Sequence, residues 1–248
     1  MEVGFKSDKG RRRSNNEDAC FVLLPESVYL VADGVGGGNA GEIASRTAVN
    51  EVANYIISNP IEQASNKYAI VNYMQQCLDI ANEKIYNQAL KYTENKGMAT
   101  TMAILHIKAG KAYIANVGDS RVYLQRGGEL VQLTEDHTYI NTLLKAGIIS
   151  PEQAAVDERK NVITKALGAD TGVEPDFYQV EAQGGDVFLL CTDGLYDEVT
   201  DEKIREIIGS GWKMSDLCLK LIEEANSNGG NDNITVIAVK VTEEDIHE

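Results

Sequence analysis

The stretch Val28–Glu42 constrains the fold more than any other part of this chain. It reads VYLVADGVGGGNAGE: an apolar run of small and β-branched residues, an Asp-Gly step at Asp33 and Gly34, and then three consecutive glycines. The apolar run predicts a buried strand, which delivers the Asp33 carboxylate to the edge of a sheet. The glycines allow the backbone to approach something bulky or charged, and helical spacing begins at Ala40. Taken alone, an Asp-Gly step is typical of a hairpin turn.

Three more carboxylates occupy similar positions, at or beside the end of an apolar run: Asp119, Asp193 and Asp232. Folding requires no acid at such a place, and four carboxylates gathered without a cation would repel one another and raise some of their own pKa values. The pattern therefore predicts a metal site. The chain has 3 histidines, none spaced for metal binding, so an all-oxygen ligand set for Mg²⁺ or Mn²⁺ is favoured over zinc.

A polar loop, SDKGRRRSNNED, precedes two short apolar runs that are predicted to pair as antiparallel strands, at residues 19–24 and 28–32. Standing alone, its three arginines are typical of a solvated basic loop. The expected strand pairing changes this interpretation, because it would bring Glu17 and Asp18 close to Asp33. The loop is therefore expected to border the metal site.

A dinuclear site would make phosphate chemistry possible. Gly34 has no side chain, so any ligand there would be its backbone carbonyl, with Asp33 bridging the two ions. Two ions about 4 Å apart would lower the pKa of a shared water, and the natural electrophile for that water is a phosphate ester. Arg13 could then hold two phosphate oxygens and neutralise charge in the transition state. Cys191 lies within a strand run and is interpreted as core packing rather than as a nucleophile.

The alternation of periodicities predicts the fold class. Strands are predicted at residues 2–5, 19–24, 28–32, 98–107, 111–117, 121–125, 129–133, 177–181, 186–192 and 234–241, and helices at 40–58, 65–94, 139–146, 201–208 and 215–227, with a helix start at 150–151. The strands between 98 and 133 are expected to form one antiparallel meander. Grouped strands and paired helices favour an α+β fold, a four-layer αββα sandwich of two antiparallel β-sheets flanked by pairs of α-helices. We expect a single domain over residues 1–248, with a small flap subdomain at about 134–173.

Charge and cysteine usage narrow the possible partners. The formal charge of −15, from 38 acidic against 23 basic residues, is a poor match for nucleic acid or an anionic membrane. The 4 cysteines lack disulfide-framework or metal-ligand spacing, which favours buried free thiols and a reducing cytoplasm. Neither an export signal nor a membrane-spanning segment is expected. The sequence thus predicts a cytoplasmic protein that binds neither nucleic acid nor membrane.

The motifs RRRSNNED, VADGVGG, ATTM, NVGDSR, LTEDHT, NVITKALG, CTDGLYD and GGNDNITV together resemble the metal-dependent serine/threonine protein phosphatases of type 2C, in their compact bacterial form. The resemblance covers nearly the whole chain. It implies a sandwich of two antiparallel sheets with a dinuclear metal centre at one end. It also implies a monomeric enzyme that acts on phosphorylated proteins and opposes a bacterial eukaryotic-like serine/threonine kinase.

The resemblance also assigns site residues. It implies four direct metal ligands: the carboxylates of Asp33, Asp193 and Asp232 and the carbonyl of Gly34. Arg13 would grip the phosphoryl group. Glu17 and Asp18 would serve the second metal, directly or through water, and Asp119 with Asp193 would hold a third ion.

Two departures from the family pattern concern the proton donor. Val35 stands where many animal members have a histidine, and Gly38–Asn39 follows the glycines where bacterial members often have one. A metal-bound water is therefore the preferred donor. His137 is expected to order the start of the flap. The flap segment AAVDERKN also lacks a histidine often found there, which bears on substrate choice.

Three alternatives stay open beside a general phosphatase. One is a phosphatase of a single regulatory target, such as a phosphorylated anti-sigma antagonist. Another is a catalytically silent metal-binding module, which would require the loss of a metal ligand. A nucleotide-binding protein is disfavoured, because GVGGGNAGE lacks the lysine and the Ser/Thr of a P-loop.

Overall fold

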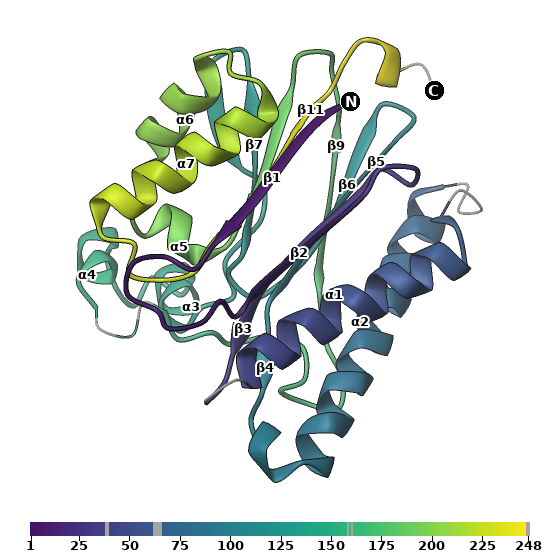
Figure 1. Ribbon diagram of the computed structural model, residues 1–248, viewed down its shortest axis with the longest axis vertical. Coiled ribbons are helices and arrows are strands. Elements are labelled where there is room, and N and C mark those ends of the chain that lie inside the picture. The colour runs from purple at the N-terminus through teal and green to yellow at the C-terminus, as the bar shows by residue number, and fades with distance from the viewer. Residues whose placement is uncertain (38–39, 62–65, 158, 160, 247–248) are drawn as a thin grey trace.

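Two antiparallel sheets, packed face to face, form the centre of the computed structural model, which describes residues 1–37, 40–61, 66–157, 159 and 161–246 (Figure 1). The first sheet contains, in spatial order, β1 (Glu2–Asp8), β11 (Ile234–Lys240), β10 (Val187–Cys191), β7 (Arg121–Arg126) and β8 (Glu129–Gln132). The second contains β2 (Asp18–Leu23), β3 (Val28–Val35), β5 (Met102–Lys108), β6 (Lys111–Val117) and β9 (Asp176–Glu181), with β4 (Ala99–Thr100) paired to β3.

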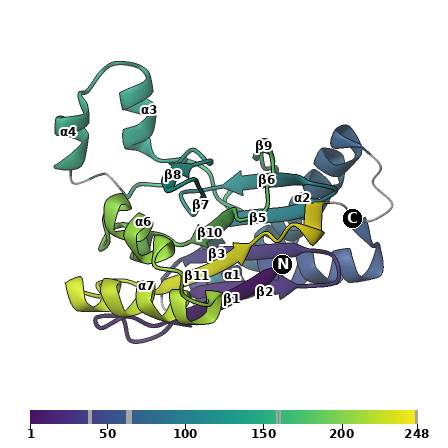
Figure 2. The same ribbon diagram turned by 90° about the horizontal axis from the view of Figure 1, so that it is seen from above.

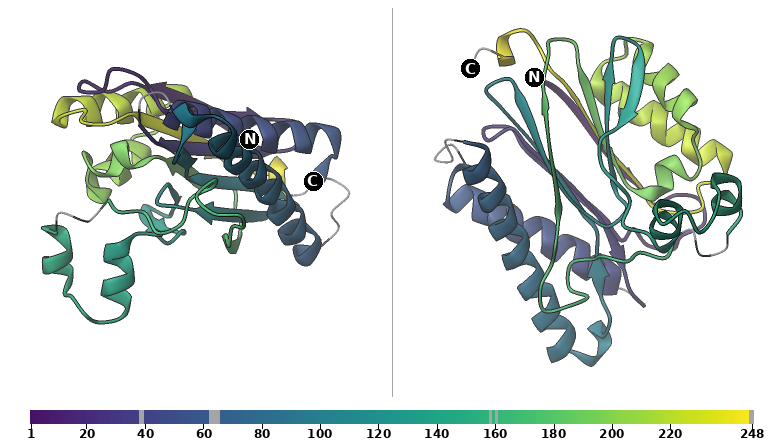
Figure 3. Two further views of the ribbon diagram at one scale, coloured as in Figure 1. Left: turned by 90° about the horizontal axis from the view of Figure 1, so that it is seen from below. Right: turned by 180° about the vertical axis from the view of Figure 1, so that it is seen from behind.

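Helices cover the outer face of each sheet. The second sheet carries α1 (Ala40–Ser58) and α2 (Lys67–Lys91), followed by a 3₁₀ turn at Thr93–Asn95, whereas the first carries α6 (Asp201–Gly209) and α7 (Met214–Asn228). Two short helices, α3 (Tyr139–Lys145) and α4 (Pro151–Ala155), project from one end of the sandwich (Figure 2). The described part of the chain ends in a 3₁₀ turn, Glu244–Ile246, which lies with the N-terminus at the opposite end (Figure 3). Among the described residues, no helix is long and apolar enough to cross a membrane.

The buried apolar side chains form three clusters, one for each interface between neighbouring layers. Along β3, Leu30 packs toward α1 and α2 while Val31 packs between the sheets. Along β11, Val236 packs toward α6 and α7 while Ile237 faces the other sheet. Successive residues of a strand point to opposite faces, so strands buried on both faces read as continuous apolar runs. The predicted α+β sandwich of two helix-flanked antiparallel sheets is confirmed.

The prediction that the strands between residues 98 and 133 form one antiparallel meander is wrong. β6 pairs with β5 and β9, whereas the next strand, β7, pairs with β10 and β8 in the other sheet. The chain leaves the second sheet at Gly118, whose φ of +97° lies in the left-handed region that glycine tolerates best. The crossing places Asp119 between the ends of the two sheets, not within a hairpin. The sequence showed the break between two apolar runs but not the change of sheet.

Several element boundaries also differ from prediction: the strand expected at 98–107 is divided into β4 and β5, and the helix expected at 65–94 ends at Lys91, before the 3₁₀ turn. β3 continues past residue 32, because Gly34 and Val35 pair with Thr100 and Ala99 of β4. The chain after β10 enters a short helix, α5 (Asp193–Tyr196), which the sequence did not predict. The features expected at Gly38–Asn39, together with Ser65 at the start of the second helix, two positions of the flap segment (158 and 160) and the last histidine (247), lie outside the described residues.

Candidate metal centre

The hairpin of β2 and β3 brings two carboxylates to one end of the sandwich. Asp18 lies directly opposite Asp33 in the antiparallel register, which confirms the predicted pairing of these strands. The Asp33 N–H donates to Thr101 Oγ1 at 2.8 Å, and its carbonyl accepts from the Thr101 N–H at 2.9 Å and from Thr100 Oγ1 at 2.7 Å. The backbone of Asp33 is therefore fixed by Thr100, the last residue of β4, and by Thr101, between β4 and β5.

The glycines that follow Asp33 and Asp193 are required because another segment of backbone lies in close contact with each of them. A Cβ at Gly34 would lie 2.1 Å from the carbonyl oxygen of Gly41, in the first turn of α1. A Cβ at Gly194 would lie 2.0 Å from the carbonyl oxygen of Asn233. The sequence predicted a close approach at the glycines that follow Val35, not at Gly34, where the structure shows that the approaching group is the protein's own chain.

Asp193 reaches the same end of the sandwich from the other sheet. It is the first residue of α5, and the preceding Thr192 donates its hydroxyl to Asp18 Oδ2 at 2.9 Å. The same hydroxyl oxygen accepts from the Thr235 N–H at 3.0 Å. Thr192 and Thr235 thus tie Asp18 of one sheet to the strand ends of the other.

Burial and mutual repulsion raise the pKa values of the carboxyl groups in this cluster. Burial, and then the charges of Asp193 and Asp232, raise the pKa of Asp18 to about 7. Burial, and then the charge of Asp232, raise the pKa of Asp193 to about 6. Asp119 is 4% exposed, and burial followed by the charge of Asp193 raises its pKa to about 8. The pKa of Asp33 is raised well above its usual value, by burial and by the other carboxylates.

The donor set fits hard divalent cations. Asp18 Oδ1 and Asp193 Oδ1 are buried and have no hydrogen-bond partner, so each is an oxygen available to a cation. Within the described residues, however, no three Asp, Glu, His or Cys side chains converge as a complete cation site. Because carboxylates repel one another, they do not by themselves gather into a complete coordination shell. A complete shell is also not required, because Mg²⁺ commonly keeps several water ligands. The cluster therefore supplies part of a coordination shell.

Arg13 and Asp232 meet at the rim of this cluster. Arg13 Nη2 donates to Asp232 Oδ2 at 2.6 Å, and the arginine side chain is 48% exposed. Burial acts to lower the pKa of Arg13, but the neighbouring Asp232, and after it Asp33 and Glu17, raise it above its usual value. The structure therefore brings a solvent-accessible guanidinium to the same place as the carboxylates.

The loop that carries Arg13 is held by the last part of the chain. The Arg11 and Arg12 N–H groups donate to the Gly230 carbonyl at 2.7 and 3.1 Å. Asn233 is 4% exposed; its Oδ1 accepts from the Glu17 N–H at 2.7 Å, and its Nδ2 donates to two loop carbonyls at 2.9 Å each. Sequence reasoning did not assign Asn233 a role, although it lies next to Asp232.

Two other residues that the sequence singled out, His137 and Cys191, are buried in the fold. His137 is buried, and its Nδ1 accepts from the Gly118 N–H at 3.0 Å, so it braces the crossing that precedes Asp119. Cys191 is fully buried in the core, as predicted, and burial raises the pKa of its thiol. The 4 cysteines are free thiols, and Cys20 is only half-buried.

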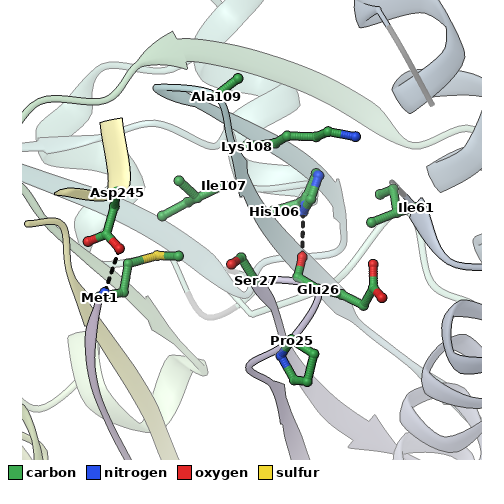
Figure 4. A pocket seen from close by; sticks show the side chains of 10 residues that line it. All are labelled: Met1, Pro25, Glu26, Ser27, Ile61, His106, Ile107, Lys108, Ala109 and Asp245. Atoms are coloured by element: carbon green, nitrogen blue, oxygen red, sulfur yellow. Dashed lines mark hydrogen bonds and ion pairs between the residues drawn. The ribbon is translucent and has the colours of Figure 1, made fainter. Parts of the chain in front are cut away.

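A continuous depression lies beside the carboxylates. A cavity of about 390 Å³ is bounded by Arg13, Asp193 and Asp232. It shares Asn161 and Asp197 with a larger groove of about 590 Å³, which runs between the sandwich and the helices α3 and α4. A separate cavity of about 290 Å³ lies at the far end of the sandwich, beside Glu26 and His106 (Figure 4). The depression beside Arg13 adjoins the carboxylates, and the far cavity does not.

The sequence profile described as Protein phosphatase 2C matches residues 8–225. This chain belongs to the protein phosphatase 2C family, a class of serine/threonine protein phosphatases. The protein phosphatase PhpP of Streptococcus pneumoniae is 37% identical over 248 residues and covers 99% of each chain.

Solved structures agree with this assignment. The serine/threonine phosphatase of S. agalactiae has a TM-score of 0.91 at 34% identity, over 97% of this chain and 99% of that one. The catalytic domain of the serine/threonine protein phosphatase PstP, solved in complex with two manganese ions, has a TM-score of 0.84 at 33% identity, over 97% of each chain.

Proposed function

We propose that this enzyme hydrolyses phosphoserine and phosphothreonine in proteins and that Mn²⁺ or Mg²⁺ ions at the acidic end of the sandwich make the reaction possible. The observation that carries the proposal is the meeting of an accessible guanidinium, Arg13, with buried carboxylates that have unpartnered oxygens. PstP in complex with two manganese ions supports the choice of metal. Mg²⁺ remains the alternative ion, and a third ion would lie between Asp119 and Asp193.

The chain's own residues would divide the work. Asp33, Asp193 and Asp232 would hold two ions with their carboxylates, and Gly34 with its carbonyl. Asp18 and Glu17 would act on the second ion, directly or through water. When bound, the ions supply positive charge to the phosphoryl oxygens and make water a better nucleophile.

Arg13 would bind the phosphoryl group. Its guanidinium can offer two parallel N–H donors to two phosphate oxygens. In the structure one of its donors is used by Asp232, so substrate binding would exchange this carboxylate for phosphate, or share it. The increasing negative charge on the phosphoryl oxygens would strengthen this contact in the transition state.

The setting of the reaction follows from the sequence. We propose one catalytic domain over residues 1–248, acting as a monomer in the cytoplasm, with the segment at about 134–173 as a flap beside the substrate groove. Its substrates would be phosphorylated proteins, including a bacterial eukaryotic-like serine/threonine kinase and the targets of that kinase. The four free thiols support a reducing compartment. The charge of −15 argues against nucleic acid as a partner.

The test is hydrolysis of a phosphothreonine peptide and of p-nitrophenyl phosphate, with Mn²⁺, Mg²⁺ or EDTA, by wild type and Asp193→Ala. We expect activity that needs metal and is lost in the variant. Wild type that is inactive on both compounds with Mn²⁺ would leave a silent binding module or a phosphatase strictly specific for one regulatory target. Full activity in Asp193→Ala would refute the assignment of Asp193.

A further inference from the structure

Asp119 belongs to no strand or helix, so its position depends on a few contacts. It lies in the crossing between β6 and β7, where Gly118 is braced by His137. The next residue, Ser120, shares a hydrogen bond of 2.7 Å with Thr101 Oγ1. The carbonyl of Asp119 itself accepts from the Tyr196 hydroxyl at 2.9 Å. This last contact joins the crossing to α5.

Tyr196 is the last residue of α5, and Asp193 is the first. Residues three apart lie on the same side of a helical turn. The turn is anchored by Leu195, which is fully buried in the core beneath α6 and α7. The hydroxyl of Tyr196 therefore connects the backbone of Asp119 to the same rigid turn that carries the Asp193 carboxylate.

The ring of Tyr196 is held in place by a half-buried arginine. The Arg121 guanidinium carbon lies 3.5 Å from the centre of the ring. Arg121 is fixed in turn by Asp136, through Nε at 3.0 Å and Nη2 at 2.7 Å, and by the Tyr123 hydroxyl at 2.8 Å. A ring stacked on a fixed cation has little freedom, so its hydroxyl is a fixed donor.

We propose that Tyr196 is a positioning residue that sets the separation of Asp119 and Asp193 and thereby the affinity for the divalent cation these two carboxylates would share. The inference rests on the proposed metal centre. The two carboxylates repel each other in the absence of a cation, and only one of them is part of a helix. Without the hydroxyl, the crossing would move away from α5, and cation binding would then have to draw the two together again. Residues that orient metal ligands typically contribute about 10- to 100-fold to metal affinity.

The test is calorimetric titration of the metal-free, full-length protein with Mn²⁺ alone. Tyr196→Phe keeps the ring over Arg121 and removes only the hydroxyl. Tyr123→Phe is the matched control: it also removes a hydroxyl next to Arg121 but has no bond to Asp119, and Asp136 still holds Arg121 through Nε and Nη2. Tyr196→Leu removes ring and hydroxyl together. Thermal unfolding of each metal-free variant establishes that it is folded.

We expect Tyr196→Phe to weaken one Mn²⁺ binding event about tenfold while the others keep the wild-type affinity, with Tyr196→Leu weaker still. Tyr123→Phe is expected to titrate like wild type. In activity assays, Tyr196→Phe should need more Mn²⁺ for half-maximal rate and recover at saturating Mn²⁺, which general loosening of the fold would not produce.

Two results would overturn this role of Tyr196 and leave the metal centre intact: wild-type titration in Tyr196→Phe, or equal weakening in Tyr123→Phe. A wild type that binds no Mn²⁺ would instead refute the metal centre and this inference together. An unfolded Tyr196→Phe would also count against the proposal, because the hydroxyl would then act on the stability of the fold.

Discussion

Arg13 combines exposure with a fixed geometry. Its side chain is nearly half exposed, yet its guanidinium contacts Asp232 at 2.6 Å, and the preceding two residues are bound through their N–H groups to Gly230. A loop pinned by its backbone presents its side chains at fixed positions. Arg13 is therefore ready to receive an anion before the substrate arrives, which reduces the ordering cost of binding.

Replacing Arg13 by alanine tests this role at the scale of one residue. We expect Arg13→Ala to lower kcat/KM for p-nitrophenyl phosphate about 10- to 100-fold, since a hydrogen bond to a charged group contributes about 1.5–3 kcal/mol. Arg12→Ala is the control, because it removes an adjacent exposed guanidinium and is expected to leave the rate unchanged. Steady-state kinetics of both variants at saturating Mn²⁺ give the answer; equal losses would indicate a general effect of loop charge.

The sequence identified the acidic residues of the site but not the neutral residues that hold them. A carboxylate that interrupts an apolar run, as at Asp33 or Asp193, has no role in folding and is conspicuous. Thr101, Thr192 and Asn233 are not conspicuous, because threonine and asparagine are common at strand ends. Their roles depend on which strands meet in space, and short-range pattern does not contain that information.

Among the elements, the loop before β2 depends most on a distant segment. Asn233, just before β11, binds this loop at three backbone groups. A loop held in this way behaves as part of the sheet that holds it. The proposed metal centre would therefore include the loop and β11 as one unit.

Asn233→Ala would remove the side-chain hydrogen bonds that hold the loop next to β11. We expect it to reduce the free energy of unfolding by about 2–3 kcal/mol, because it leaves buried backbone groups without partners. Hydrogen exchange should rise in residues 9–17 more than elsewhere. Asn228→Ala, which removes an exposed amide bonded to the Glu198 carbonyl, is the control and should lower stability far less. Urea unfolding measures the difference, and similar losses in the two variants would contradict the assigned role.

Element prediction succeeded where periodicity was long and failed where it was short. The helix at Ala40–Ser58 has the predicted bounds, because apolar residues recur on one face over 19 residues. The 4 residues of α5 are too few to show a helical period. The change of sheet after Val117 was also missed, since a strand has the same alternation in either sheet.

At the scale of the whole molecule, the buried carboxylate cluster opposes the stability of the metal-free fold as pH rises, and the proposed cations would remove this effect. The pKa values of Asp18, Asp119 and Asp193 are raised relative to the unfolded chain, first by burial. A carboxyl group with a raised pKa stabilises the fold at low pH, and this contribution is lost as pH rises through the folded-state pKa. The metal-free protein should therefore lose stability between about pH 4 and pH 8 on account of these groups.

Cations should reverse this loss. We expect Mn²⁺ at about 100 times its Kd to stabilise the fold by about 2.7 kcal/mol, and to raise the Tm by about 5–10 °C near pH 8. The increase should be much smaller near pH 5, where protons compete for the same carboxylates. Thermal unfolding with Mn²⁺ or EDTA at both pH values checks this. A shift independent of pH would place the cations away from the carboxylate cluster.

The position of β11 has a consequence for protein synthesis. This last strand lies between β1 and β10, and the residues just before it fix the loop that carries Arg13. A ribosome that has made only the elements before β11 has thus produced a first sheet with a gap between β1 and β10, and the loop that carries Arg13 lacks its anchor. A nascent chain that still lacks β11 is expected to be inactive, so phosphatase activity begins only after this strand is inserted.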